Sequence, residues 1–287
     1  MRIAHLITAY KNPYQLERLL KATYHDNSDF YIHLDGNVDF GEYEFLENMN
    51  RVFFIKNRIK VVWGGYSFTQ AIFNSITEIL NTGINYSFIN LMSSQDYPIK
   101  SISCLYEYLK EREGYSFVSY ALPDKEIWWK ETMTRITSYN FNDYKFKGRY
   151  LIQRIVNQLL PKRKFPLPVK LYGSSCATWW TLSTGCAQYL VDYMNSNKKL
   201  SNFMCYTWGP DEYLIPTLLM NSPHKDSIIN DNLRYIDWSQ GGARPKLLTL
   251  SDLSALKECG KFLARKFDPE LDSEVLDHLD EFIHVNS

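Results

Sequence analysis

The chain has 287 residues, which suits one large α/β domain or two small domains. Its 32 basic and 32 acidic residues cancel, and this balance argues against a general nucleic-acid-binding protein. No stretch approaches the roughly 18 continuous apolar residues of a membrane span, and no signal peptide opens the sequence, so we expect a cytoplasmic protein.

Strands and helices alternate through the first 120 residues. The strands are short apolar runs, and the helices carry apolar residues at the spacing of one helical face. This alternation predicts an α/β fold with a mostly parallel central sheet and helices on both faces. We expect strands over 2–9, 30–34, 52–55, 61–62, 86–92 and 115–120, and helices over 14–23, 67–81 and 102–113.

The segment 121–170 differs from the rest, because it is rich in Trp, Lys, Arg and Tyr and has poor periodicity. We predict one helix over 151–160 and read the segment as an insertion that carries substrate contacts. The basic run Pro161-Lys-Arg-Lys-Phe165 could dock on a membrane face, although such a run is more often a solvated loop. Beyond it we expect a strand region over 173–183, helices over 184–195, 211–220 and 252–258 with Ser251 as a cap and Gly260 as a stop, and a peripheral acidic helix within 268–287.

Two adjacent carboxylates, Asp211 and Glu212, follow a Gly209-Pro210 turn and lead into a predicted helix. Apolar neighbours such as Trp208 raise the pKa of a carboxylate, and the turn fixes its direction, which suits a general base. The alternative is that both acids only cap the helix, since acids favour helix N-termini. Taken alone, this segment favours the capping role.

Polar residues also follow two predicted strands, where open α/β sheets bind their ligands. Asp35-Gly36 follows the second strand, and Ser93-Ser94-Gln95-Asp96 follows the strand over 86–92. A carboxylate after the second strand is well placed to accept hydrogen bonds from a ribose or a uracil ring. Both segments could equally be simple turns.

Several common motifs are missing from the sequence. No GxGxxG follows the first strand, and neither a GxxxxGK[ST] loop nor a GxSxG elbow occurs. The five cysteines form no zinc pattern, and the first half lacks the Asp-x-Asp pair that usually holds a metal on a nucleotide-sugar diphosphate. Without a metal, a leaving diphosphate needs fixed protein cations. Candidates are Arg244, Lys246, Arg265 and Lys266, which could also form a solvated basic surface.

Six segments, taken in their order and spacing, carry a resemblance to a known family. They are Phe30–Asp35, Val62–Ser67, Asn90–Lys100, Tyr172–Ser175 with Trp179–Ser183, Gly209–Glu212 and Phe262–Asp268. The sequence resembles the core-2/I-branching β-1,6-N-acetylglucosaminyltransferases and peptide O-xylosyltransferases (glycosyltransferase family 14), in a short version that looks bacterial. The five cysteines do not reproduce the disulfides of the animal members.

The resemblance implies a GT-A-type fold, inverting chemistry and no metal. Glu212 would be the catalytic base, Asp35 would contact the uridine, and Lys266 would bind the diphosphate. The family has a second diphosphate ligand upstream of Lys266, which would be Arg244, with Lys246 close enough to leave the choice open. We assign to the same nucleotide site three further residues of the matching segments: Trp63, Ser94 and Asp96.

The acceptor side matches the family least. We expect acceptor contacts from Trp128, Lys130, Arg135, Trp208, Asp211 and Trp238. Aromatic rings stack on sugars, and Trp238 lies in a predicted exposed loop, but a buried aromatic patch would explain Trp128 and Trp129 equally well. We treat residues 1–287 as one domain, with a nucleotide-binding half (1–120), an acceptor-side insertion (121–170) and an acceptor and catalytic half (171–287).

The resulting prediction is an inverting glycosyltransferase that needs no cofactor and uses a UDP-sugar. We expect UDP-GlcNAc as the donor, with UDP-xylose, UDP-glucose and UDP-galactose as alternatives, and a glycan acceptor in surface-polysaccharide synthesis. A lipid-linked acceptor would bring the protein to the inner membrane face. Two alternatives stay open: a non-catalytic protein that binds nucleotide sugars or glycans, and a metal-dependent retaining transferase.

Overall fold

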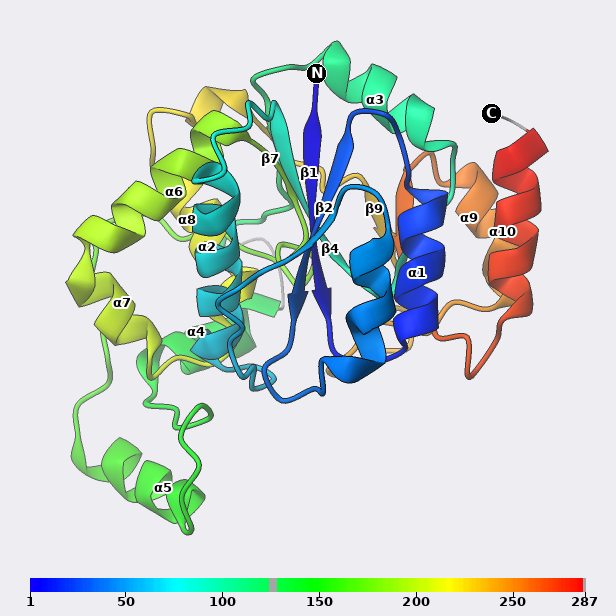
Figure 1. The fold of residues 1–287 in the computed structure, drawn as a ribbon. Helices are drawn as coiled ribbons and strands as arrows, with labels where there is room; N and C mark the ends of the chain where they lie inside the picture. Colours follow the sequence, from blue (N-terminus) through cyan, green and yellow to red (C-terminus); the bar gives the residue numbers. More distant parts are fainter. Residues whose placement is uncertain (124–127, 286–287) are drawn as a thin grey trace.

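A seven-stranded sheet of order β3-β2-β1-β4-β7-β6-β8 forms the centre of the computed structural model, which describes residues 1–123 and 128–285 (Figure 1). Strands β3, β2, β1 and β4 are parallel, and so are β6 and β8, while β7 runs antiparallel to both of its neighbours. The predicted mostly parallel sheet is thus confirmed. The strands are β1 (Ile3–Ala9), β2 (Ser28–Leu34), β3 (Val52–Phe54), β4 (Phe88–Ser93), β6 (Ser116–Phe117), β7 (Thr181–Ser183) and β8 (Ile228–Ile229).

Helices cover both faces of this sheet. In Figure 1, α2, α6 and α8 lie on one side, and α1, α9 and α10 on the other. Successive side chains of β1 point to opposite faces of the sheet. Leu6 packs in the hydrophobic core on the α2 side, and Ile7 packs in the hydrophobic core on the α1 side. The helices are α1 (Pro13–Ala22), α2 (Tyr66–Leu80), α3 (Ile102–Lys110), α4 (Trp128–Thr137), α5 (Arg149–Leu159), α6 (Thr184–Ser196), α7 (Lys198–Met204), α8 (Leu214–Met220), α9 (Leu253–Glu258) and α10 (Glu274–Val285).

A second, three-stranded sheet joins segments that lie far apart in the sequence. Strand β10 (Leu263–Arg265) pairs antiparallel with β5 (Asp96–Pro98) and parallel with β9 (Arg234–Ile236). None of these strands was predicted, because three residues are too few to show a period. The sheet matters for function, since it brings the residues after β9 and β10 to the carboxyl end of β4.

Several other local predictions need correction. The predicted strand region over 173–183 holds a strand only at β7, and the insertion over 121–170 holds α4 in addition to the predicted helix. Residues 61–62 form no strand and lie in a loop beside β2. The predicted helix over 211–220 is divided into a 3₁₀ turn, Pro210–Glu212, and α8. Thr249 and Asp252 form the capping box before α9 in place of Ser251, whereas Gly260, with φ of 74°, ends that helix as predicted. Among the described residues, no helix has the length and apolarity needed to cross a membrane.

Candidate active site

A cavity of about 370 Å³ opens at the carboxyl ends of β1, β2 and β4. Parallel sheets place ligand sites at this edge. Its wall combines strand ends with the turn at 209–212 and the segments that follow β9 and β10. The polar and aromatic lining includes Thr8, Tyr10, Asp35, Trp63, Ser93, Gln95, Ser175, Thr178, Trp179, Trp208, Asp211, Glu212, Trp238, Arg244, Arg265 and Lys266.

Glu212 lies at one end of this cavity, and 20% of its side chain is exposed. Its Oε2 accepts a 2.7 Å hydrogen bond from Nη1 of Arg135. Burial and the neighbouring charge of Asp211 raise the pKa of Glu212 to about 7, although Arg135 and Trp128 oppose that rise. A carboxylate with this pKa accepts and releases protons near neutral pH, as a general base must.

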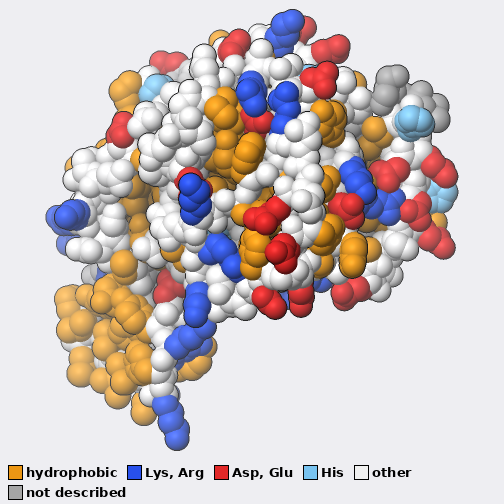
Figure 2. All heavy atoms as spheres, viewed as in Figure 1, with side chains coloured by type: hydrophobic (Ala, Val, Ile, Leu, Met, Phe, Trp, Pro, Cys, Tyr) orange, Lys and Arg blue, Asp and Glu red, His pale blue; other side chains and the backbone are white. Residues whose placement is uncertain are grey.

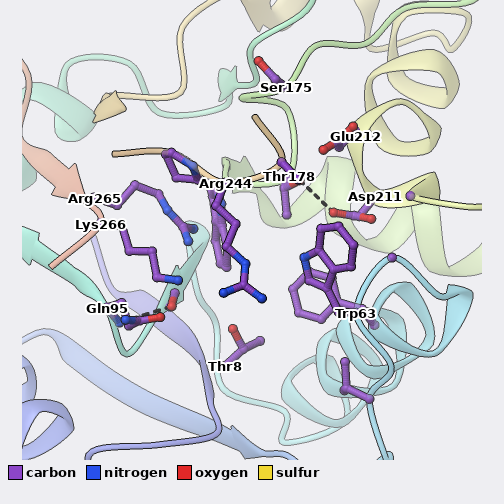
Figure 3. A pocket seen from close by; sticks show the side chains of 18 of the residues that line it. Thr8, Trp63, Gln95, Ser175, Thr178, Asp211, Glu212, Arg244, Arg265 and Lys266 are labelled. Carbon is purple, nitrogen blue, oxygen red and sulfur yellow. Dashed lines mark hydrogen bonds between the residues drawn. The ribbon is translucent and has the colours of Figure 1, made fainter. Parts of the chain in front are cut away.

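Asp211 is held separately from Glu212. Thr178 donates a 2.8 Å hydrogen bond to its Oδ2 (Figure 3), and burial raises its pKa. The structure gives α8 no side-chain cap, and the turn before it has none either. Neither acid makes the side-chain capping bond that the alternative expects: Asp211 accepts from Thr178, and Glu212 accepts from Arg135.

An aromatic and cationic stack fixes the surroundings of Glu212. The guanidinium of Arg135 lies 3.9 Å from the ring of Trp208, and Trp208 meets Trp63 edge-on at 5.2 Å. Gly64 makes this approach possible: a Cβ built there would lie 2.4 Å from Nε1 of Trp208. The amide of Gly209 also donates to the carbonyl of Gly64 at 2.8 Å. The loop at 63–65 and the turn at 209–212 are thus locked together.

The opposite end of the cavity is cationic. Figure 3 shows Arg244, Arg265 and Lys266 extending into the same space. Burial and the positive charges of Arg265, Arg244 and Lys11 lower the pKa of Lys266 to about 8. Like charges repel in a buried site unless an anion joins them. This cluster therefore suits a ligand with several negative charges.

The structure separates the two candidates for the second diphosphate ligand. Lys246 donates to Asp252 at 2.5 Å and lies 4.0 Å from Asp237. It does not line the cavity, whereas Arg244 does. Arg244 is therefore the residue that can meet an anion beside Lys266.

Asp35 lies at the end of β2, within the cavity wall, as predicted. Its Oδ1 accepts from the amide of Val61 at 3.2 Å and from both the amide and Nδ2 of Asn37 at 2.8 Å. These three bonds all end on Oδ1 and hold the carboxylate in place, so Oδ2 takes no part in them. Trp63 and Trp238 also line the cavity. The indole nitrogen of Trp238 is buried and finds no acceptor among the described residues, so it can donate to a ligand.

Two predicted nucleotide contacts are wrong, because neither residue lines the cavity. Ser94 is fully buried. Asp96 is also fully buried, 3.6 Å from both Arg234 and Arg265, so it supports Arg265 instead of touching a ligand. The neighbours Ser93 and Gln95 face the cavity in their place, and Tyr10 donates to Gln95 at 2.8 Å.

Some of the residues predicted to contact the acceptor also lie outside the cavity. Arg135 and Trp128 do not line the cavity but act on Glu212, which Arg135 contacts directly. Lys130 is exposed on α4 and lies outside the cavity, and Trp129 is buried in the core as the aromatic-patch alternative proposes. Three lining residues were not predicted as site residues: Thr178, Gln95 and Trp179. Of these, Gln95 and Trp179 lie inside segments that already carried the family resemblance.

The described residues contain no group of three or more His, Cys, Asp or Glu side chains that could hold a metal ion. The cations of the site come from Arg and Lys side chains.

Comparison with known families decides the assignment. The model of the family "Branch: Core-2/I-Branching enzyme" matches residues 3–257. The chain belongs to this family. The predicted family is thereby confirmed and, with the mostly parallel sheet, so is the predicted α/β fold of GT-A type.

Curated relatives of this family member are named xylosyltransferases. Xylosyltransferase 2 of Rattus norvegicus is 26% identical over 309 residues, which cover 98% of this chain and 33% of the relative. The xylosyltransferase of Ciona intestinalis is 26% identical over 304 residues, which cover 98% of this chain and 34% of the relative. The chain spans about a third of the length of these relatives.

Solved structures of low sequence similarity were also found. The galactosyltransferase LgtC, in complex with donor and acceptor sugar analogues, has a TM-score of 0.45 and 9% identity, covering 98% of this chain and 95% of its own. The apo form of mouse xyloside xylosyltransferase 1 has a TM-score of 0.39 and 12% identity, covering 91% of this chain and 97% of its own.

Proposed function

We propose that this protein transfers a sugar from a UDP-sugar to a hydroxyl group of a glycan, with inversion at the anomeric carbon. One observation carries the proposal: a single cavity has a carboxylate with a pKa of about 7 at one end and a cluster of three cations at the other. A displacement reaction needs a base beside the nucleophile and positive charge beside the leaving group.

The proposed reaction is one displacement. Glu212 takes the proton of the acceptor hydroxyl, and the hydroxyl oxygen forms a bond to the anomeric carbon. The bond from that carbon to the UDP oxygen breaks on the opposite face, and both of its electrons leave with UDP. A UDP-α-sugar then gives a β-linked product, and the proton stays on Glu212 until water removes it.

Lys266, Arg244 and Arg265 would stabilise the charge that develops on the leaving diphosphate. Fixed cations in a partly enclosed site need little reorganisation during the reaction, which makes them effective. Because these side chains supply the charge that a divalent metal supplies elsewhere, we propose that transfer needs no metal. Asp35 and Trp63 would hold the nucleoside at the ends of β2 and the following loop.

We also propose the class of the donor sugar. UDP-GlcNAc is the donor predicted from the family resemblance, and the relatives named xylosyltransferases support UDP-xylose as the first alternative. We further propose a glycan acceptor, a role in surface-polysaccharide synthesis and a cytoplasmic location, as the sequence predicts.

The proposal is tested by measuring turnover and binding separately. In EDTA, we expect UDP and one UDP-sugar to raise the melting temperature, because a ligand of the folded state stabilises it. We expect Glu212→Gln to keep this binding and to lose transfer. A protein that binds the donor but transfers nothing to any glycan would support the non-catalytic alternative. Stabilisation only with Mn²⁺ would overturn the cationic-cluster model, and an α-linked product would overturn inversion.

A further inference from the structure

Helix α5 exposes an unusual amount of apolar surface. None of its residues is buried, and it projects away from the body of the molecule (Figure 1). Leu151 is 64% exposed and Leu159 is 78% exposed. Figure 2 shows the resulting patch of hydrophobic side chains over this helix. Exposed apolar patches of this kind mark surfaces that bind something. We define the α5 patch as Tyr150, Leu151, Ile152, Ile155, Leu159 and Leu160, all exposed.

The helix is fastened to the protein by its polar face. Asn157 bonds to the amide and carbonyl of Tyr139, and Gln153 accepts from the amide of Phe141. Leu151, Ile155 and Leu159 repeat every four residues, so they share one face, about 200° round the helix from the face of Gln153 and Asn157. The apolar face therefore points away from the body, opposite to the arrangement of an ordinary surface helix.

The segment around the helix is strongly basic. The whole chain balances 32 basic against 32 acidic residues, yet no Asp or Glu occurs between Tyr144 and Val191. Figure 2 shows Lys and Arg side chains beside the apolar patch. Eight basic residues fall between 144 and 171: Lys145, Lys147, Arg149, Arg154, Lys162, Arg163, Lys164 and Lys170.

We propose that the α5 patch docks on an anionic phospholipid surface. The leucine and isoleucine side chains enter the boundary between headgroups and acyl chains, with the helix lying along the interface. Exposed lysines beside them meet the lipid phosphates, since a basic segment is attracted to an anionic leaflet. Tyr150 suits the same boundary, where aromatic rings gather.

Charge favours this occupant over a second copy of the chain. A symmetric dimer through the α5 patch would bring the same surface of each copy together. Every basic residue at the patch would then face its equivalents with no acidic residue of the segment to pair with them. An anionic lipid surface satisfies both the apolar face and its basic border.

One residue of the basic run predicted to dock on a membrane lies away from the proposed lipid surface. Arg163 is only 8% exposed and donates to the carbonyls of Ser138, Phe203 and Tyr206. It holds the loop after α5 to the body and cannot reach a membrane. The predicted docking run over 161–165 is thus replaced by helix α5, with Lys162 and Lys164 at its border.

The test is sedimentation of the full chain with phosphatidylcholine vesicles that contain or lack phosphatidylglycerol. We expect binding to the anionic vesicles, weakened by salt, and little binding to the neutral ones. The triple variant Leu151→Ser, Ile155→Ser, Leu159→Ser should bind at least about tenfold less well, because three apolar contacts are lost. Leu271→Ser, which changes an equally exposed leucine elsewhere, should bind like the wild type.

All four changed side chains are exposed, so the melting temperatures should agree and loss of binding cannot be ascribed to unfolding. The proposal fails if the wild type ignores anionic vesicles or if the triple variant binds as well as the wild type. It also fails if the wild type forms a dimer that the triple variant abolishes while neither binds lipid, because the patch would then be a protein interface. Vesicle binding needs no sugar transfer, so this outcome is independent of the proposed activity.

Discussion

The cavity and helix α5 both reverse the usual distribution of residues, in opposite directions. The cavity takes charges inside: Glu212, Asp211, Arg265 and Lys266 are largely enclosed. Helix α5 puts leucine and isoleucine outside. Soluble proteins ordinarily do neither. A fold tolerates such reversals where function requires them, which supports the proposed roles of the cavity as the donor site and of α5 as the lipid-docking surface.

The supports of the two regions differ as well. The cavity residues are fixed by sheet ends, by ion pairs and by stacked rings, whereas α5 is held through Gln153 and Asn157. The loop over 139–143 meets both regions, because Tyr139 and Phe141 hold α5 while Asn142 donates to the carbonyl of Trp63 at 2.9 Å. Changes to side chains that do not bond to this loop, such as Glu212 or the exposed leucines of α5, should still act on one region alone.

The largest expected effect follows from Glu212→Gln. The amide keeps the size of the side chain but cannot accept a proton, so transfer should fall on the order of 10³-fold. UDP binding, measured by calorimetry, should change little, and vesicle binding should not change at all. Retention of most of the activity would remove Glu212 as the base.

The second effect concerns the cationic cluster. Arg244→Ala should weaken UDP binding and reduce transfer by about 10²-fold, because a cation beside the leaving group is lost. Lys246→Ala is the matched control: it removes a cation two residues away that pairs with Asp252, and it should change transfer only slightly. Equal losses in both variants would show that the effect is structural. Calorimetry with UDP and steady-state kinetics measure the two quantities.

A third prediction uses the pKa of Glu212. This value, about 7, lies above the usual value for a carboxyl group, so Glu212 is increasingly protonated and inactive as the pH falls below 7. We expect kcat/KM to fall tenfold per pH unit on this limb.

Arg135 lowers the pKa of Glu212, so its loss should move the acidic limb upward. In Arg135→Gln, a shift of about one pH unit would reduce kcat/KM about fivefold at pH 7 and about tenfold well below it. Arg135→Lys keeps the charge and should shift the limb less. A profile that stays in place in Arg135→Gln would show that the limb reports another group.

The sequence predicted much of this arrangement where the signal is local. The Gly-Pro turn before Glu212 and the strand before Asp35 are short-range features, and both residues line the cavity. Arg135 was named as an acceptor contact, but its ion pair with Glu212 could not be foreseen, because the two residues are far apart in sequence and α4 shows no clear period. The paired strands β5 and β10 were invisible for the same reason, and β5 is what turns Asp96 inward.

The orientation of helix α5 could not be predicted from the sequence, for a different reason. The sequence predicted a helix over 151–160, close to the observed bounds. Periodicity identifies an apolar face but does not say what covers it. The orientation is set by Gln153 and Asn157, whose partners Phe141 and Tyr139 lie in a loop. Side-chain bonds to a loop backbone leave no repeating pattern in a sequence.

The smallest expected effect is the loss of stability in Gly64→Ala, which tests whether the cavity wall is rigid. Gly64→Ala adds a Cβ at 2.4 Å from Nε1 of Trp208 and strains a backbone with φ of 69°. Gly83→Ala is the matched control, because φ is 74° there and nothing lies within 4 Å of the new Cβ. Strain alone should cost about 1 kcal/mol in unfolding free energy at Gly83, and the clash should add about 1–3 kcal/mol at Gly64. Denaturant unfolding measures both. If Gly64→Ala lost no more stability than Gly83→Ala, Trp208 would be free to move, and the wall beside Glu212 would be as loosely held as α5.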